Sequence, residues 1–233
     1  MKTRIILLLM VLASLCNFTA AATRTYQIPH KSVPTSSHKP PNLSTITVNG
    51  VADIDPAKAF GSRDPVLVIE IFSDFQCPTC KQFFETTLKR VMDNYVTGAT
   101  PCKIYVVHRD FLISYHAYSR IAANYSRAAA HIGKCQDVEA ALFQNQQKWE
   151  ATGDVRGIVA SVLTPAEMKK VQAFVDAKTF EPFVDHDHQL GLQLPVRGTP
   201  TMVFHTRDGK TYPVNGIVDY EVLKDFLDQL LVR

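Results

Sequence analysis

Hydrophobic and polar positions divide the chain into segments with two periodicities. Val66–Phe72 is an almost unbroken run of β-branched and apolar residues, which is typical of a strand buried on both faces. A helical pattern follows to about Tyr95, and Lys103–His108 has the composition of a second strand. From about Ser114 to Leu192 the apolar positions recur at helical spacing. This order predicts an α/β protein in which a long helical stretch separates two groups of strands.

The C-terminal part of the chain returns to strand character. Thr201–His205 and Thr211–Asn215 have strand patterns, and Arg207–Lys210 between them supplies a hairpin turn. Asp219–Val232 then forms an amphipathic helix. Within the helical stretch, Thr164–Glu167 predicts a helix start with a capping threonine, a proline at the first position and a glutamate at the third.

The N-terminal segment has the organisation of a secretory signal peptide over residues 1–22. Lys2 and Arg4 form its charged start, Ile5–Cys16 its apolar part, and small residues precede the expected cleavage site. A lipoprotein-type site at Cys16 is not favoured, because Leu15 is bulky where a small residue is needed. We therefore expect a periplasmic or otherwise extracytoplasmic protein.

Residues 23–58 are rich in proline, serine and threonine, and we expect an extended lead-in with at most a short strand at Thr45–Val48. The formal net charge falls from +3 to +1 without Lys2 and Arg4, because residues 1–22 contain no acid. This balance gives no reason to expect a nucleic-acid partner. With 46% hydrophobic residues the mature chain has enough apolar material for one domain with a large insertion.

The chemistry of the sequence is concentrated in Cys77-Pro78-Thr79-Cys80, at the junction between the first strand and the first helix. Unpaired N–H groups and the helix dipole stabilise negative charge at a helix N-terminus, which favours a thiolate on Cys77. Pro78 suits the first helical position, and Cys80, one turn into the helix, is placed to resolve a mixed disulfide. Half of a zinc site or a static disulfide are the alternatives. The flanking strand and helix favour a redox pair.

Two further cysteines remain once Cys16 has been removed with the signal peptide. Cys102 precedes the second strand, and Cys135 lies at the expected junction of two helices. In an oxidising compartment they are predicted to form a structural disulfide that ties the helical stretch to the sheet. The alternative is two unreactive thiols, one at a strand end and one buried on a helix face.

The element order and two motifs resemble the DsbA-like thiol–disulfide oxidoreductases. One motif is Phe72–Cys80, close to the F-S-D-F-Q-C-P-x-C run of that family, and the other is Gly198–Thr201, which looks like its cis-proline loop. The resemblance covers about Ala59 to Arg233. It implies a thioredoxin-like fold over residues 59–113 and 193–233, with a helical insertion over 114–192.

The resemblance also implies roles for particular residues. Cys77 corresponds to the attacking thiolate and Cys80 to the resolving thiol. Pro200 corresponds to the cis-proline facing the disulfide, and Thr199 to the residue whose backbone binds an extended substrate. An ordinary trans proline is the alternative at Pro200.

One departure from the family concerns its buried acid, which many relatives carry six residues before the first cysteine. Here that position is Ile71, and Glu70 lies one residue earlier. Because strand side chains alternate, Glu70 is expected to face the other side of the sheet. Asp74, at the strand end, is the second candidate for a proton relay. Either acid could instead be solvated or cap the turn.

The predicted activity is that of a dithiol oxidase that introduces disulfides into exported, cysteine-containing proteins. Oxidation is favoured over isomerisation, because isomerases of this class usually dimerise through an added domain that we do not expect in this chain. We expect a membrane redox partner to recycle the pair, no cofactor or bound metal, and a monomer. The alternatives are a reductase, an isomerase, a metal chaperone, and a thiol carrier or substrate binder without turnover. Pro78-Thr79 lacks the histidine of the strongest oxidases, so the redox poise stays open.

Other candidate residues have ordinary interpretations. His186 and His188 are not favoured as metal ligands, because positions i and i+2 do not share a helix face. His108 is expected to be an ordinary residue at a strand end.

Overall fold

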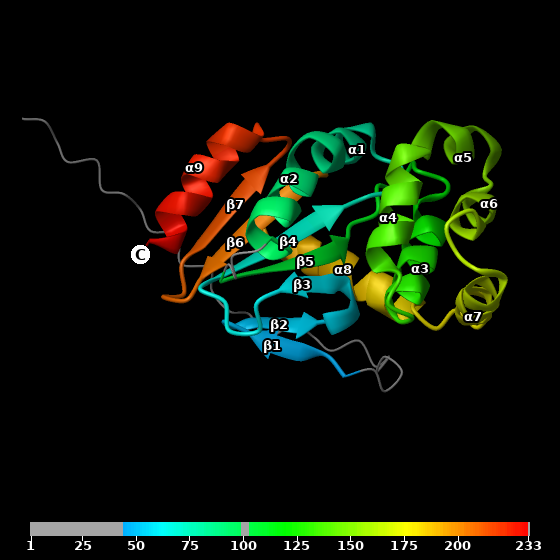
Figure 1. Cartoon of the computed structure of the whole chain (residues 1–233), viewed down its shortest axis with the longest axis horizontal. Coiled ribbons are helices and arrows are strands. Elements are labelled where there is room, and N and C mark those ends of the chain that lie inside the picture. Colours follow the sequence, from blue (N-terminus) through cyan, green and yellow to red (C-terminus); the bar gives the residue numbers. More distant parts are fainter. Residues whose placement is uncertain (1–43, 99–102, 233) are drawn as a thin grey trace, which may run out of the picture. The chain divides into compact units, whose positions relative to one another are not determined.

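The computed structural model of the protein describes residues 44–98 and 103–232 (Figure 1). A five-stranded sheet with the order β3-β5-β4-β6-β7 forms its centre, and β4 and β5 are parallel while the other neighbours are antiparallel. The strands are β3 (Ala59–Gly61), β4 (Leu67–Ser73), β5 (Ile104–Asp110), β6 (Thr201–Thr206) and β7 (Thr211–Asn215). The predicted hairpin of β6 and β7 is therefore confirmed, and the predicted first and second strands correspond to β4 and β5.

The central strand β4 is buried along its whole length, as its apolar run predicts. It pairs in register with β5, so that Ile71 lies beside His108 and Ser73 beside Asp110. Side chains of a strand alternate between the two faces of a sheet, and neighbouring paired residues share a face. Ile71, Ser73 and His108 consequently belong to one face, and Glu70 belongs to the other.

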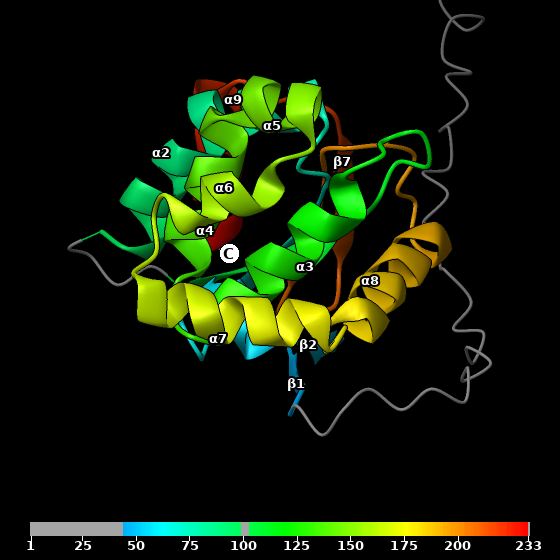
Figure 2. The same ribbon diagram turned by 90° about the vertical axis from the view of Figure 1, so that its right-hand side faces the viewer.

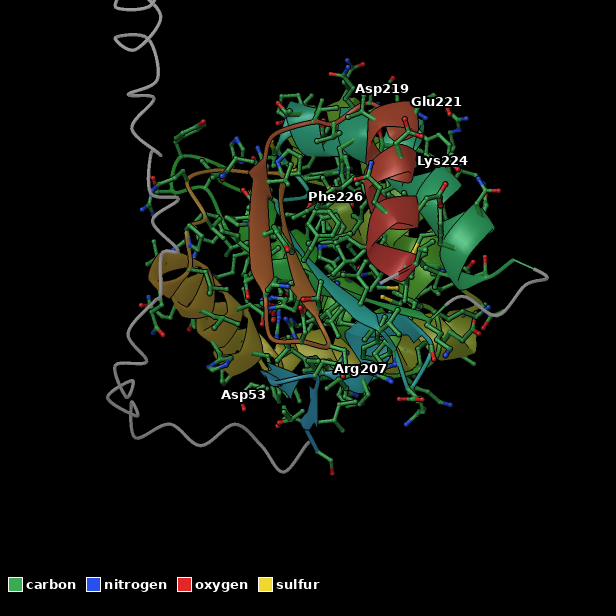
Figure 3. The ribbon with its side chains drawn as sticks, turned by 90° about the vertical axis from the view of Figure 1, so that its left-hand side faces the viewer. Asp53, Arg207, Asp219, Glu221, Lys224 and Phe226 are labelled. Atoms are coloured by element: carbon green, nitrogen blue, oxygen red, sulfur yellow. The ribbon has the colours of Figure 1, made fainter. Side chains whose placement is uncertain are left out.

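The face of the sheet that carries Ile71 is covered by the first helical segment and by the last helix. The first segment comprises α1 (Pro78–Phe83), η2 (Phe84–Leu88), α2 (Lys89–Val91) and η3 (Met92–Val96), in which η2 and η3 are turns of π-helix. The last helix is α9 (Tyr220–Leu231). Phe226 extends from α9 toward the strands, whereas Glu221 and Lys224 lie on its outer side (Figure 3). The ring of Phe226 meets Phe204 of β6 edge-on, with 5.2 Å between the centroids. The amphipathic pattern predicted for this helix is confirmed.

The opposite face is covered by a small hairpin, β1 (Ile46–Val48) and β2 (Val51–Ile54), and by α8 (Glu181–Gln193), whereas the short helix η1 (Pro56–Lys58) directs Lys58 toward Glu139 on the other face. Gly191 allows α8 to approach closely, because a Cβ atom there would lie 2.4 Å from a ring carbon of Phe111. The short strand expected at Thr45–Val48 is present as β1, but the predicted extended lead-in is wrong for residues 51–58, where Ile54 and Lys58 are fully buried. Residues 23–43 and the signal-peptide segment lie outside the described residues.

The helices inserted between β5 and β6 pack on one another around their own apolar core (Figure 2). Besides α8 they are α3 (Ser119–Ala130), α4 (Cys135–Gln144), α5 (Gln146–Thr152), α6 (Val155–Ala160) and α7 (Pro165–Asp176). The capping box predicted at Thr164 and Glu167 is present at the start of α7. Phe75, Cys77 and Cys80 belong to this core together with Trp149. The segment after β4 is therefore packed against the inserted helices.

Buried charges connect the sheet with the inserted helices. Arg127 of α3 pairs with Asp110 at 2.5 Å, with Asp55 at 3.3 Å and with Asp187 of α8. Arg109 of β5 also pairs with Asp187, at 3.0 Å. Buried ions are stable only when they are paired and hydrogen-bonded, so this network ties β5, α3 and α8 to one relative position.

Candidate active site

Cys77 stands at the start of α1, immediately after the turn that ends β4. Its backbone N–H donates to the Asp74 carbonyl at 3.1 Å, and its own carbonyl accepts from Lys81 N at 3.1 Å, the first bond of the helix. From α5, the Gln146 amide donates to the carbonyls of Phe75 and Cys77 at 2.7 and 3.0 Å. The cysteine at the helix start is thus held by both the sheet and the inserted helices.

Asp74, one of the two predicted relay acids, is buried and holds the turn together. Its Oδ1 accepts from Gln76 N at 2.8 Å and from the Ser119 hydroxyl. Its Oδ2 accepts from Ile113 N at 2.8 Å and lies 3.0 Å from His116 Nδ1. A carboxylate engaged by four partners is an anchor between the segments that follow β4 and β5. This geometry favours positioning over proton transfer.

Glu70, the other predicted relay acid, lies on the face of the sheet away from α1, as strand alternation predicts. Its carboxylate accepts from Arg109 Nε at 2.8 Å and lies 2.8 Å from His205 Nε2. Burial alone would raise the pKa of Glu70, but these two partners hold that pKa below its ordinary value. The sheet itself separates Glu70 from the cysteines, so it cannot serve as their relay.

The two thiols of the C-x-x-C have opposite pKa shifts. The pKa of Cys77 is lowered to about 5, mainly by a hydrogen bond from the Cys80 thiol and further by the Thr199 side chain and by the backbone N–H groups of Cys80 and Thr79, against an opposing effect of burial. Burial raises the pKa of Cys80 well above its ordinary value, and the neighbouring Cys77 raises it further. At neutral pH the pair therefore consists of one thiolate and one thiol.

The loop before β6 meets Cys77 from the other side. The Thr199–Pro200 peptide bond is cis, and the Thr199 carbonyl lies 3.5 Å from Cys77 Sγ. The buried Thr199 hydroxyl has no hydrogen-bond partner among the described residues, so it is available to donate to the thiolate. Two segments separated by more than a hundred residues thus form one site, which can attack a disulfide and hold the backbone beside it.

Comparison with known proteins agrees with this geometry. Residues 55–229 match a family model described as thioredoxin. The chain belongs to the thioredoxin family. It is 25% identical over 195 residues to disulfide bond formation protein D of Bacillus subtilis, covering 79% of this chain and 81% of the relative.

Solved structures place the fold within the DsbA-like branch. BdbD from Bacillus subtilis superposes with a TM-score of 0.60 at 20% identity, over 76% of this chain and 93% of BdbD. A variant of alpha-DsbA1 from Wolbachia pipientis gives a TM-score of 0.61 at 20% identity, over 75% and 90% of the two chains. The predicted fold class is confirmed, and the protein is a DsbA-like protein-disulfide oxidoreductase.

The remaining candidates are placed as follows. Cys135 opens α4 as a buried thiol, and burial raises its pKa well above the ordinary value. Cys102 lies outside the described residues, so the predicted disulfide stays a prediction. His186 lies 3.4 Å from Asp53, and the ring of His188 stacks on Phe111, on the face of the sheet away from α1.

A polar group beside the cysteines was missed at the level of the sequence. His108 lies within β5 rather than at its end, and its Nδ1 is 2.7 Å from the carboxylate of Glu139 on α4. Lys58, which was assigned to the extended lead-in, completes the group. A histidine at an alternating, inward position of an apolar strand was the available signal. Its partners come from segments that no local pattern connects.

Proposed function

We propose that this DsbA-like oxidoreductase works as an extracytoplasmic dithiol oxidase, which passes its Cys77–Cys80 disulfide to cysteines of exported proteins. In the transfer a substrate thiolate attacks Cys77 Sγ, Cys80 leaves, and a second substrate thiolate then releases Cys77 as its thiolate. The released pair is oxidised again by a membrane redox partner. The relative named for disulfide bond formation supports this direction.

The observation that carries the proposal is the low pKa of Cys77, at about 5. A thiolate that is stabilised in the reduced enzyme makes the reduced form more favourable and the disulfide more oxidising. Thioredoxin, with a thiol pKa of about 7, has a potential near −270 mV, and DsbA, at about 3.5, one near −120 mV. The pKa of Cys77, at about 5, lies between these two values, which favours a pair more oxidising than that of thioredoxin.

Thr199 and Pro200 are assigned to the binding of an extended substrate segment. The Thr199 carbonyl lies 3.5 Å from Cys77 Sγ, which supports a role for this backbone in holding a substrate segment beside the reacting sulfur. Hydrogen bonds to the substrate backbone do not depend on the identity of its side chains, which suits an enzyme that accepts many substrates. No helix among the described residues is long and apolar enough to cross a membrane.

The test is the equilibrium potential of the Cys77/Cys80 pair against glutathione, read by alkylation and mass spectrometry. A value of about −200 mV or higher supports the oxidase, and one near −270 mV identifies a reductase instead. A second assay follows the oxidation of a reduced secreted protein with several cysteines. Glutathione disulfide supplies the oxidant for the variants: Cys77 of Cys80→Ser first takes up glutathione, a substrate thiolate then displaces it, and the enzyme–substrate mixed disulfide should accumulate, whereas Cys77→Ser should form none. Equal mixed-disulfide formation by both variants would contradict the assigned roles.

A further inference from the structure

A cluster of buried polar side chains lies on the same face of the sheet as α1. Glu139 Oε1 is at its centre, 2.5 Å from Lys58 Nζ, 2.7 Å from His108 Nδ1 and 3.0 Å from the Ser126 hydroxyl. Despite burial, His108 and Lys58 lower the pKa of Glu139, so its carboxylate is ionised. An ionised carboxylate only accepts hydrogen bonds, and His108 Nδ1 must therefore carry the hydrogen.

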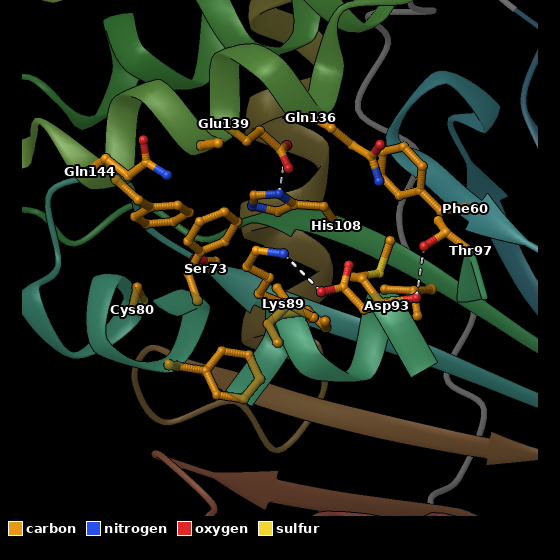
Figure 4. A pocket seen from close by; sticks show the side chains of 18 residues that line it. Phe60, Ser73, Cys80, Lys89, Asp93, Thr97, His108, Gln136, Glu139 and Gln144 are labelled. Atoms are coloured by element: carbon orange, nitrogen blue, oxygen red, sulfur yellow. Dashed lines mark hydrogen bonds and ion pairs between the residues drawn. The ribbon is translucent and has the colours of Figure 1, made fainter. Parts of the chain in front are cut away.

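The other nitrogen of His108 is the unusual atom. Nε2 is buried and has no hydrogen-bond partner among the described residues. A buried polar atom without a partner is costly and calls for an explanation such as an exchanging proton or a water. The ring lines a cavity of about 360 Å³, which has room for water (Figure 4). Ser73, Cys80 and Glu139 line the same cavity.

Ser73 connects this cavity to the resolving cysteine. Ser73 and Cys80 line it together, and the Ser73 side chain acts to lower the pKa of Cys80, against the stronger effect of burial. On the sheet, Ile71 pairs with His108, so Ser73 stands at the next position of the same face, diagonally across from His108. Ser73 and His108 line the same cavity, so water held there can connect the Ser73 hydroxyl to His108 Nε2.

We propose that His108 Nε2 accepts and returns the proton of Cys80, through the Ser73 hydroxyl and water in the cavity. The inference rests on the proposed function of the Cys77–Cys80 pair. His108 is held by Glu139 in the tautomer that leaves Nε2 able to accept, and Lys58 balances the charge of that carboxylate. Ile71 stands where a buried acid was sought in the sequence, and the imidazole of His108, its paired neighbour on β5, takes the role of proton acceptor.

The proton balance of each step follows from this assignment. When the reduced pair is oxidised, Cys77 forms a mixed disulfide and Cys80 Sγ–H gives its proton to His108. The Cys80 thiolate then attacks Cys77 Sγ, the Cys77–Cys80 bond forms, and the partner sulfur leaves as a thiolate. When a substrate is oxidised, its thiolate attacks Cys77, the Cys77–Cys80 bond breaks, and Cys80 recovers the proton from the imidazolium.

Several other ionisable side chains lie around the imidazole of His108. Glu139 from α4 and Asp110 from β5 interact with it directly, and Cys80 lies across the cavity. Lys58 from η1 and Cys135 from α4 are further titratable groups, which interact with Glu139. The ring also contacts Phe75, with 5.3 Å between the centroids. Lys89 and Asp93 form an exposed ion pair among the residues that line the cavity, on the side where protons can exchange with solvent.

The experiment separates the two thiols in time. Reduced enzyme is mixed with one equivalent of dithiobis(nitrobenzoate), whose leaving thiolate is coloured. The first phase reports attack by Cys77, and the second reports attack by Cys80 on the mixed disulfide. In His108→Gln we expect an unchanged first phase and a second phase slowed at least about tenfold at neutral pH. Its rate should then rise about tenfold per pH unit, as hydroxide replaces the imidazole.

The matched control is His188→Gln. His188 is also an imidazole with a buried, unpartnered nitrogen, but it stacks on Phe111 across the sheet from α1. Both phases of this variant should keep the parental rates and pH profiles. The same behaviour in folded His108→Gln would overturn the proposal. If the parent enzyme itself showed no first phase, Cys77 would not react as a thiolate, and the function proposed for Cys77 would be contradicted instead.

Chemical rescue distinguishes proton transfer from a structural role. His108→Ala enlarges the cavity by the volume of the missing ring, and added imidazole should accelerate its second phase in proportion to concentration. N-Methylimidazole retains the basic nitrogen and should also rescue, whereas pyrrole should not. Ser73→Ala provides an independent variant, for which we expect a slower second phase with an unchanged first. A second phase insensitive to imidazole and to Ser73→Ala would exclude the relay, even if His108→Gln were poorly folded.

Discussion

Replacing Cys80 by alanine should raise the pKa of Cys77, because the Cys80 thiol makes the largest contribution to lowering it. A hydrogen bond to a charged group contributes about 1.5–3 kcal/mol, and one pKa unit corresponds to about 1.36 kcal/mol. Loss of this bond should therefore raise the pKa of Cys77 from about 5 by about one to two units. The Cys77 thiol would then be partly protonated at neutral pH, and Cys77 would react more slowly.

Cys80→Ser is the matched control, because its hydroxyl retains a donor at the same position. The pKa of Cys77 should remain near 5 in this variant. The assay is the pH dependence of alkylation of Cys77 by iodoacetamide, with the modified site identified by mass spectrometry. The ultraviolet absorbance of the thiolate, measured against Cys77→Ser, provides a second measurement.

Two results would refute the reasoning. If Cys80→Ala titrated at the parental pH, the helix start and the Thr199 side chain would be sufficient to stabilise the thiolate. If the alanine and serine variants showed the same raised pKa, the loss of the sulfur's packing would be responsible instead of the hydrogen bond.

Four further predictions follow from the same structure. Thr199→Val should raise the pKa of Cys77 by less than Cys80→Ala, and an unchanged titration would show that the Thr199 hydroxyl does not face the thiolate. The reduced protein should lose thermal stability relative to the oxidised protein as the pH falls from 9 to 5, because only the reduced form gains from a Cys77 pKa depressed below its ordinary value of 9.0. A difference in melting temperature that is constant over this range would contradict it. Arg127→Met should cost about 3–5 kcal/mol in urea unfolding, because buried carboxylates lose their partner, and a loss below about 1 kcal/mol would show that they are already satisfied. Mass spectrometry of the unreduced mature protein should find Cys102 and Cys135 joined, and two alkylatable thiols there in the denatured chain would end that prediction.

Local patterns were sufficient for the elements that carry the two cysteines. The apolar run of β4, the proline after Cys77 and the start of α7 at Thr164 depend on residues within a few positions of one another. Such signals need no distant partner, since strand burial, helix capping and proline geometry are properties of short segments. The same alternation placed Glu70 correctly on the face away from α1.

The chemistry around the cysteines depended on the packing of distant segments. Lys58, His108 and Glu139 come from a segment expected to be extended, from a strand and from an inserted helix, and each has an ordinary appearance in the sequence. Residues 44–58 fold because the sheet and the inserted helices supply surfaces on which they can be buried, and no composition reveals such a surface. The helix start predicted a reactive Cys77, and its neighbour Cys80 is local, whereas only the tertiary structure brought the distant Thr199 beside the thiolate. Periodicity specifies which face a side chain occupies, but the neighbour it meets there is decided when the layers pack together.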